Sequence, residues 1–276
     1  MLSARSFLSV ARLSAGFLSP RCHSGRSWSD ALSLVQSGAC VAVSLDCFDT
    51  LLARGIPDWE QHVLAEVGGM IAGLSARQAR HCLSLARKRA LRLAGGDKEP
   101  STAAIWGQYC FITGLPERVA AQFCIHELKL LEITSRASAD ALSFVATIQA
   151  LRLQWIVCSD TRWSAFALSG LLQGKGFAIG PESVFCSSDH CSSKFRGRLY
   201  SIAYQHLVES LGRNVPPAAI LHVGDNFFAD NCSAASFGMR TVNVPAASLP
   251  PGHVADTDAI NAYLDLVRRD ITLGVQ

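Results

Sequence analysis

Five short apolar runs rich in β-branched residues recur along the chain, and each has the length and composition of a buried strand. Segments with apolar residues at helical spacing separate most of these runs. This alternation predicts an α/β fold with a doubly wound, mostly parallel sheet. The predicted strands cover residues 39–46, 153–159, 183–187, 218–224 and 240–244.

More than 100 residues separate the first predicted strand from the second, far more than one crossover helix requires. Most of this interval shows helical patterns, at residues 61–71, 75–93, 102–113 and 116–133. Ser75 begins one of them like a capping box, and Pro116 stands at a helix start. We therefore predict an all-α domain over residues 57–136, inserted into a core made of residues 38–56 and 137–250. Residues 251–276 are predicted as a C-terminal extension with a helix over 257–269.

Residues 1–29 differ in composition from the rest of the chain, because they contain four arginines, many serines and no acidic residue. This composition is typical of an organellar transit peptide, although a disordered basic extension fits it equally well. The four arginines contribute +4 to the formal charge of +3, so residues 30–276 carry a net charge of about −1. A general basic surface for nucleic acid is therefore not expected. No apolar run approaches the ~18 residues that span a bilayer.

The ten cysteines are dispersed and form no C-x-x-C pair. This spacing argues against a zinc cluster and favours free thiols in a reducing compartment. We predict a cytoplasmic protein, or a mitochondrial matrix protein if residues 1–29 are a targeting segment. No pattern indicates the oligomeric state.

Polar residues stand at the ends of the predicted strands. Asp46 ends the first strand, Ser159 ends the second, and Asp225 follows the strand over 218–224. Lys194 lies in a loop that precedes another helical segment, and Asp230 follows Asp225 closely. Singly, each has an ordinary explanation: a turn, a helix cap or a solvated lysine. Their occurrence in order at separate strand ends favours one shared site, since open α/β sheets bind ligands at that edge.

The chemistry of these side chains fits phosphoryl transfer. Two carboxylates, Asp46 and Asp225, supply the hard oxygen ligands that Mg²⁺ prefers. The hydroxyl of Ser159 can bind a phosphoryl oxygen, and Lys194 supplies a positive charge. Gly224 is expected to let the backbone turn sharply after the strand. By contrast, His222 lies inside an apolar run and is predicted to be a packed core histidine.

In this order, the segments Asp46–Leu52, Ser159, Lys194 and Asp225 with Asp230 resemble the four motifs of the haloacid dehalogenase (HAD) superfamily. The resemblance covers about residues 38–245 and implies a Rossmann-like core with a C1-type helical cap. It also implies that Asp46 is the nucleophile, that Thr50, Ser159 and Lys194 position the phosphoryl group, and that Asp46, Asp225, Asp230 and the carbonyl of Phe48 hold Mg²⁺. More narrowly, the chain is similar to predicted bacterial HAD hydrolases associated with polysaccharide glycosyltransferases.

The chain departs from the pattern of HAD phosphatases at position 48. Those enzymes resemble Asp-x-Asp-x-Thr and use the second Asp as general acid and base, whereas this chain has Phe48. Losing such a group costs about 10²–10⁴-fold in rate. In an extended segment, the side chain of the neighbouring Asp49 points to the face opposite that of residue 48. Three alternatives follow: a substrate with a good leaving group, such as an acyl phosphate or pyrophosphate, a proton donated by another residue, or a large loss of catalysis.

The preferred hypothesis is a Mg²⁺-dependent HAD-like phosphohydrolase that forms an aspartyl phosphate on a small phosphorylated metabolite. A first alternative is a catalytically weak protein that binds a phospholigand or a partner. A second is a haloacid dehalogenase, since those members also lack the second Asp. Their motif IV tends to lack the Gly-Asp pair that this chain has at Gly224 and Asp225.

Overall fold

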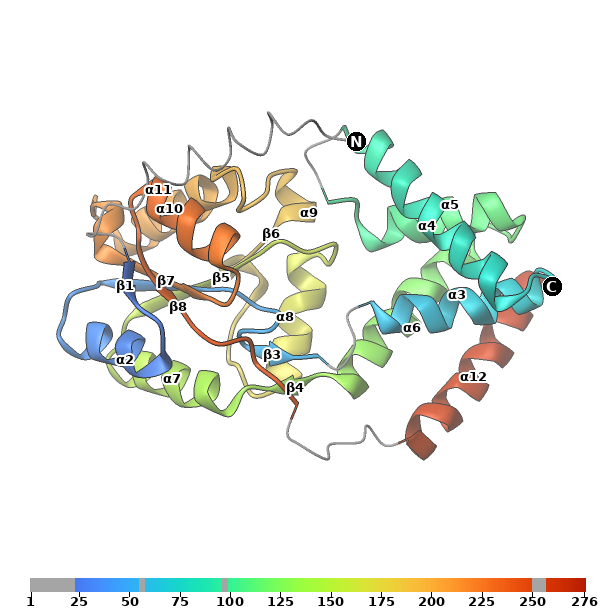
Figure 1. Cartoon of the computed structure of the whole chain (residues 1–276), viewed down its shortest axis with the longest axis horizontal. Helices are drawn as coiled ribbons and strands as arrows, with labels where there is room; N and C mark the ends of the chain where they lie inside the picture. Colours follow the sequence, from blue (N-terminus) through green and yellow to red (C-terminus); the bar gives the residue numbers. More distant parts are fainter. Residues whose placement is uncertain (1–22, 55–57, 96–98, 250–256) are drawn as a thin grey trace, which may run out of the picture.

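Parallel strands form the sheet of the core, in the order β1-β8-β7-β2-β5-β6 (Figure 1). The computed structural model describes residues 23–54, 58–95, 99–249 and 257–276. The strands are β1 (His23–Gly25), β2 (Ala42–Leu45), β5 (Gln154–Ser159), β6 (Val184–Cys186), β7 (Ile220–Gly224) and β8 (Arg240–Asn243). The five predicted strands, the doubly wound parallel sheet and the helical cap are confirmed.

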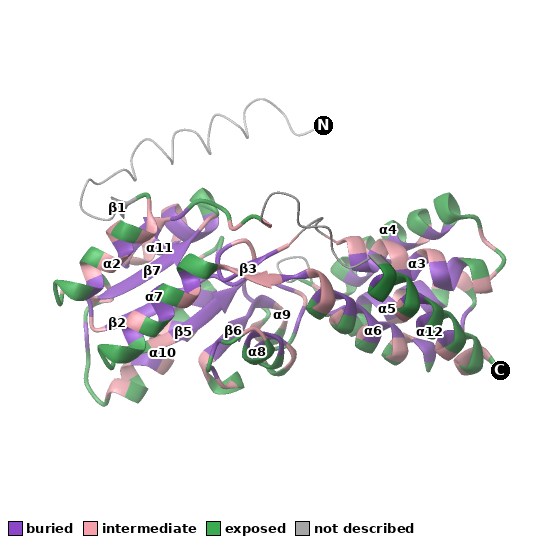
Figure 2. Ribbon diagram, turned by 90° about the horizontal axis from the view of Figure 1, so that it is seen from below, coloured by how far each residue is buried: buried purple, intermediate pink, exposed green. Residues whose placement is uncertain are grey.

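Alternate residues of the strands pack on opposite faces of the sheet, which explains their continuous apolar composition. Val43 and Leu45 face a cluster with helices α2 (Trp28–Gln36), α7 (Ala139–Ala150) and α8 (Ala165–Gly174). Ile156 and Cys158 face a second cluster with α10 (Arg198–Leu211) and α11 (Ser233–Phe237). The strands are therefore buried between two helical layers, with the outer helix faces exposed (Figure 2).

The predicted tail over residues 1–29 extends too far, because part of it belongs to the core. β1 pairs in parallel with β8, and α2 begins at Trp28 on the cap residue Ser27, whose hydroxyl accepts from the backbone N–H of Asp30. A short edge strand and a helix cap produce little hydrophobic periodicity, so the sequence pattern does not reveal them. The rest of the predicted tail, residues 1–22, lies outside the described residues.

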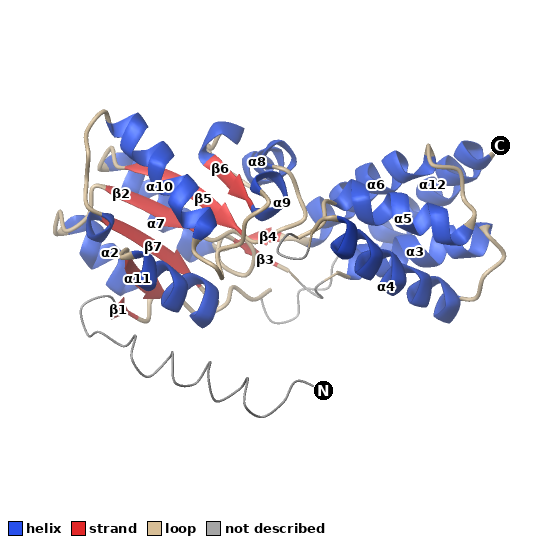
Figure 3. Cartoon of the chain, turned by 90° about the horizontal axis from the view of Figure 1, so that it is seen from above, coloured by secondary structure: helices blue, strands red, loops and turns tan. Residues whose placement is uncertain are grey.

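Among the described residues, the cap consists of helices, whereas strands lie only in the core and at the joint between the two domains (Figure 3). Its helices share one apolar cluster, with Trp106, Tyr109 and Phe123 fully buried. The helices are α3 (Trp59–Ile71), α4 (Ala76–Leu93), α5 (Thr102–Thr113), α6 (Val119–Thr134) and α12 (Thr257–Val275). Helix α12 comes from the predicted C-terminal extension and runs six residues beyond the predicted end at 269. It packs on α3 and α6, so the cap is built from the inserted segment together with the C-terminal helix.

A short antiparallel pair forms the joint between core and cap. β3 (Leu52–Ala53) carries the chain out of the core, and β4 (Arg136–Ala137) brings it back. Leu52 pairs with Ala137, and Ala53 pairs with Arg136. Because β3 begins only six residues after Asp46, this joint fixes the cap close to the end of β2. In the described part of the chain, no helix combines the length and apolarity needed to cross a membrane.

Candidate active site

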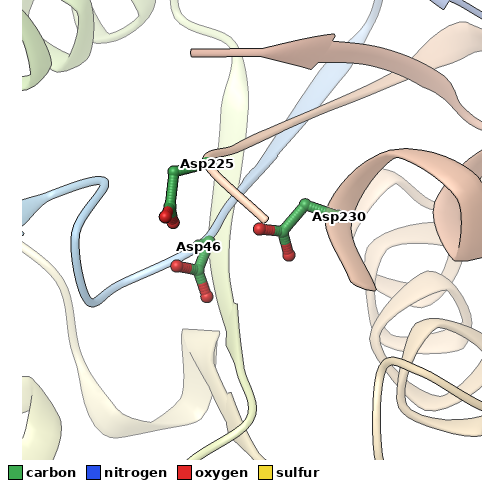
Figure 4. A group of neighbouring side chains, drawn as sticks. All are labelled: Asp46, Asp225 and Asp230. Carbon is green, nitrogen blue, oxygen red and sulfur yellow. The ribbon is translucent and has the colours of Figure 1, made fainter. Parts of the chain in front are cut away.

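The central strands bring the candidate residues together at the carboxyl edge of the sheet. β2 lies between β5 and β7, with Leu45 opposite both Val157 and Val223. Asp46 extends this pairing, because its backbone N–H donates to the carbonyl of Val223 at 2.9 Å. Asp46, Asp225 and Asp230 consequently lie side by side beyond the strand ends (Figure 4). Their carboxylates offer oxygens that all lie within 4.8 Å of one another.

Lys194 bridges two of these carboxylates from a buried position. Its Nζ donates to Oδ1 of Asp46 and to Oδ1 of Asp230, both at 2.5 Å, and its side chain is 3% exposed. Burial opposes the charge of Lys194, but Asp230 and Asp46 outweigh it and hold the pKa of Lys194 well above its usual value. Burial and the nearby Asp230 and Asp225 raise the pKa of Asp46 to about 7, against the lowering effect of Lys194. One lysine therefore does not neutralise the carboxylate cluster.

The hydroxyl of Thr50 joins two carboxylates of the cluster. It donates to Oδ1 of Asp225 at 3.1 Å and lies 3.4 Å from Oδ2 of Asp46. Thr50 is fully buried and is not among the residues that line the cavity. In this structure its direct contacts are with the carboxylates, which it can orient, while its predicted contact with a phosphoryl group stays a prediction.

Asp230 is fixed by partners on the strand and on the turn that carries it. It lies in the π-helical turn η3 (Phe227–Cys232), and its Oδ2 accepts from the backbone N–H of Asn226 at 2.9 Å. His222, which is fully buried, reaches its Oδ1 at 3.3 Å and bonds Ser44 and Tyr200 as well. His222 is thus the packed histidine that was predicted, and it supports Asp230.

Gly224 serves a different purpose from the one predicted. Gly224 does not belong to the described residues with a positive φ, so its backbone makes no left-handed turn. A Cβ on Gly224 would instead lie 2.3 Å from Oδ2 of Asp230. The glycine therefore leaves space for the carboxylate of Asp230 against the end of β7.

A cavity of about 340 Å³ opens beside the carboxylates, between core and cap. Of the predicted site residues, Asp46, Phe48, Ser159, Lys194, Asp225 and Asp230 line it. Ser159 is the last residue of β5 and is 1% exposed. It does not cap the next helix, because α8 is capped by Ser164. Asp49, whose side chain was expected on the face opposite that of residue 48, lines the cavity as well. So do residues that the sequence did not single out: Arg54, Asp58, Glu60, Glu99, Asp160, Thr161, Arg162 and Asn226.

Phe48, Asp49 and Arg54 form one wall of the cavity, called here the Phe48–Arg54 wall. The guanidinium of Arg54 lies over the Phe48 ring, 4.5 Å from its centroid, and pairs with Asp49 at 2.6 Å. Asp49 has a left-handed φ of 62°, and its N–H donates to the carbonyl of Leu52 at 2.7 Å. Such a conformation costs about 1–2 kcal/mol, although Asp tolerates it better than most residues. Asp49 is therefore held against Arg54.

Arg162 ties the core to the cap. It follows β5, and its guanidinium bonds the fully buried Glu127 of α6 at 2.7 Å and Asp58, which precedes α3, at 2.8 Å. Its backbone carbonyl accepts from the N–H of Thr102 at the start of α5 at 3.1 Å. Nearby, Asp160 accepts from the backbone N–H of Lys194 at 2.8 Å. The segment after β5 thus contacts both the lysine of the site and three elements of the cap.

The carboxylate cluster fits a divalent cation of the Mg²⁺ type. Mg²⁺ is bound by a few carboxylates together with water and phosphate oxygens, and clustered acids of this kind meet that need. Three carboxylates meet here, and Lys194 is the one cation that contacts two of them among the described residues. Asp46, Asp225 and Asp230 are the residues that would hold the ion.

No protein-family model matches the sequence, and no curated protein matches it. Solved structures do match. A HAD-like family hydrolase from Xanthomonas campestris has 16% sequence identity and a TM-score of 0.50, over 84% of this chain and 95% of that one. A HAD phosphatase from Thermococcus onnurineus has 19% identity and a TM-score of 0.46 (78% and 91% covered). A 2-haloacid dehalogenase from Pseudomonas syringae has 15% identity and a TM-score of 0.48 (82% and 99% covered).

The match to the Xanthomonas hydrolase extends over nearly the whole of that chain. At this level of identity it establishes a shared architecture. The architecture agrees with the four strand-end segments that resemble the superfamily motifs, all of which reach the same edge of the sheet. The chain therefore has the haloacid dehalogenase-like fold, in which a helical cap covers the carboxyl edge of a Rossmann-like core.

Proposed function

We propose that this protein is a Mg²⁺-dependent phosphohydrolase that acts on a small phosphorylated metabolite through an aspartyl-phosphate intermediate. The observation that carries the proposal is the contact of Lys194 with both Asp46 and Asp230, with Asp225 beside them at the sheet edge. A buried lysine that holds a carboxylate at a strand end prepares that carboxylate for attack on an anionic centre.

Each residue has a role that follows from its position. Asp46 attacks phosphorus, while Lys194 orients it and screens its charge from the phosphoryl oxygens. Asp225 and Asp230 would hold the cation with Asp46, and Ser159 positions the phosphoryl group. Thr50 orients the carboxylates of Asp46 and Asp225, which it contacts directly. A bound Mg²⁺ would neutralise phosphoryl charge as a Lewis acid. The cap excludes bulk water and selects the rest of the substrate.

The cluster of three carboxylates favours this reaction over cleavage of a carbon–halogen bond. A displacement at carbon by Asp46 requires no divalent cation, and Asp225 and Asp230 would then add only repulsion to a buried nucleophile. Phe48 favours a different alternative, a weakly catalytic protein that binds a phospholigand. Turnover separates these possibilities.

The test is hydrolysis of a panel of phosphorylated metabolites by the purified protein, with Mg²⁺ and with excess chelator. We expect turnover in Mg²⁺ that falls by at least ~10³-fold in Asp46→Asn, the loss typical of removing a nucleophile. Acid quenching should leave phosphate on Asp46, detectable by mass spectrometry. Asp140→Asn, at an exposed position on α7, is the matched control and should retain activity.

Equal activity of Asp46→Asn and the wild type would refute the proposal. Absence of turnover on the whole panel, together with Mg²⁺-dependent stabilisation by a phospholigand, would instead support the binding protein.

The compartment is also a proposal. We place the protein in the cytoplasm, or in the mitochondrial matrix if residues 1–29 direct it there. The nine cysteines of the described residues are free thiols, which suits a reducing compartment. Sequencing the N-terminus of the native protein tests whether the basic segment is removed.

A further inference from the structure

Three cationic side chains line the cavity in the described part of the chain, and they differ in what they contact. Lys194 is enclosed by Asp46 and Asp230. Arg162 uses Nε, Nη1 and Nη2 to bond Glu127 and Asp58. Arg54 pairs with a single carboxylate, that of Asp49, which is itself 29% exposed. Arg54 is therefore the cation best placed to receive a further anionic group.

The orientation of Arg54 leaves one edge of its guanidinium for a ligand. Its bonds to Asp49 use Nε and Nη2, at 3.4 and 2.6 Å, so the edge that carries Nη1 is turned away from Asp49. The Phe48 ring supports the guanidinium plane from one side. A stacked, ion-paired guanidinium is weakly hydrated and already ordered, which reduces the cost of binding an anion.

The anchoring of Arg54 sets its position relative to Asp46. Arg54 follows β3 directly, and β3 is paired with β4 at the joint of core and cap. Phe48 pairs with Leu52 in the same segment. The Phe48–Arg54 wall is therefore a short structured continuation of the strand that carries Asp46. It faces the same cavity, on the side that leads toward the cap.

The wall holds no free acid beside the nucleophile. Phe48 has no ionisable proton, and Asp49 is engaged by Arg54. A leaving group that departs along this wall meets a positive charge instead of a proton donor. Such a wall suits a leaving group that is stable as an anion and that presents two oxygens to a guanidinium, namely a carboxylate or a phosphate.

We propose that Arg54 binds the leaving group of the substrate and that the substrate is a phosphoanhydride, either an acyl phosphate or a pyrophosphate. This inference rests on the proposed phosphohydrolase function. A carboxylate oxygen of Asp46 forms a bond to phosphorus while the bond from phosphorus to the bridging oxygen breaks. The electron pair stays on the bridging oxygen, and the leaving group departs as an anion without receiving a proton. Water then attacks the aspartyl phosphate, so that Asp46 is released as carboxylate and both protons of water remain on phosphate.

The first test compares substrates on the wild-type protein in Mg²⁺. Acetyl phosphate and pyrophosphate represent the two leaving groups, and glucose 6-phosphate represents an alkyl ester that needs a proton. We expect kcat/KM for at least one anhydride to exceed that for the alkyl ester by ~100-fold or more, because Phe48 stands at the position of the usual general acid. Which anhydride is turned over identifies the leaving group. An alkyl ester that reacts as fast as both anhydrides would overturn the inference.

The second test separates binding of the leaving group from a structural role. Substituted benzoyl phosphates provide leaving groups of graded basicity. Arg54→Gln should lower kcat/KM by about 10²–10³-fold, as for loss of an oxyanion donor, with a steeper dependence on leaving-group pKa. Arg54→Lys keeps the charge, so its kcat/KM should lie between the values of Arg54→Gln and the wild type. This variant replaces Arg54→Gln in the test if Arg54→Gln does not fold. Arg89→Gln removes an arginine that stacks on Phe111 outside the cavity, at 4.3 Å, and should stay within about twofold of the wild type.

An unchanged dependence on leaving-group pKa in both Arg54 variants would show a merely structural role and would overturn the inference. In that case activity that still depends on Asp46 would leave the proposed phosphohydrolase intact. Absence of any turnover by the wild type would overturn both.

Discussion

At Gly224 the absence of a side chain decides where a carboxylate of the site can lie. Asp230 occupies the space that a Cβ would fill, and its other contacts, with Lys194 and with the N–H of Asn226, depend on that position. A glycine at a strand end is usually explained by backbone freedom, but here the cause is close approach. The distinction matters because it ties Gly224 to Asp230 and therefore to the proposed cation site.

We expect Gly224→Ala to weaken Mg²⁺ binding and to lower phosphatase activity, because the methyl group pushes Asp230 away from Lys194 and Asp225. Overpacking of this kind costs about 1–3 kcal/mol in stability. Isothermal titration with Mg²⁺ and urea unfolding measure the two effects. Gly170→Ala is the control, since a Cβ there meets nothing within 4 Å. Unchanged Mg²⁺ affinity in Gly224→Ala would contradict this account.

At the scale of elements, the segment that follows β5 is the mechanical link between the site and the cap. Directly after Ser159, the last residue of β5 and part of the cavity lining, this segment supplies Asp160 to the backbone of Lys194 and Arg162 to the cap. The contact between Arg162 and Glu127 is buried, with the carboxylate fully enclosed. Removing one partner of such a pair leaves the other charge unsatisfied, which is costly even where the intact pair contributes little.

A double-mutant cycle should detect this coupling. We expect Arg162→Met to cost about 3 kcal/mol in the free energy of unfolding. The double variant with Glu127→Gln should lose less stability than the sum of the two single variants. The difference, which is the coupling energy, should be about 1–3 kcal/mol. The exposed pair of Lys129 and Glu132 on the same helix α6 is the control and should show less than ~0.5 kcal/mol. Strictly additive losses at Arg162 and Glu127 would rule out the coupling.

At the scale of the whole molecule, two features connect the cap to the core: the ion pair of Asp58 with Arg162 and the paired strands β3 and β4. Asp58 receives Arg162 from the core and Arg87 from α4, at 2.8 and 3.1 Å. Helix α12 adds Val267 and Ile271, both fully buried, to the apolar cluster of the cap. The cap is thus built from two distant parts of the sequence and is fixed to the core by a charged contact.

This contact should give the stability of the protein a dependence on pH. Burial alone would raise the pKa of Asp58, but Arg162 and Arg87 outweigh it and lower the pKa below the ordinary value of 3.8. Stability from this group is therefore complete above about pH 4 and is lost as the pH falls through the lower folded value. Asp58→Asn should destabilise the protein at pH 7 by about 1–3 kcal/mol, and the difference from the wild type should shrink below pH 4.

Thermal unfolding of the two proteins between pH 3 and pH 7 measures this difference. Asp265→Asn is the control, because Asp265 pairs with Arg268 on the exposed face of α12 and should change stability by less than ~0.5 kcal/mol at any pH. A difference for Asp58→Asn that stays constant down to pH 3 would contradict the expected linkage.

The sequence by itself determined five of the six strands in the core sheet, the helical insertion and the set of strand-end residues. Strand burial on two faces leaves continuous apolar runs, and polar residues at their ends stand out against them. Asp46, Ser159, Lys194, Asp225 and Asp230 could be found in this way, because their chemistry shows in residue type and order. The helices of the insertion were visible for a similar reason, since amphipathic spacing and caps are local signals.

Only the tertiary structure decided the rest, because it depends on contacts between distant segments. Arg162 follows a strand that the sequence predicts, yet its partner Glu127 lies 35 residues upstream in the cap. Arg54 follows no recognisable pattern, and its position over Phe48 results from the pairing at the joint. The place of α12 in the cap and the space at Gly224 are likewise long-range effects. Local sequence specifies which elements form and which chemistry they carry, whereas packing decides which charges meet across the cavity.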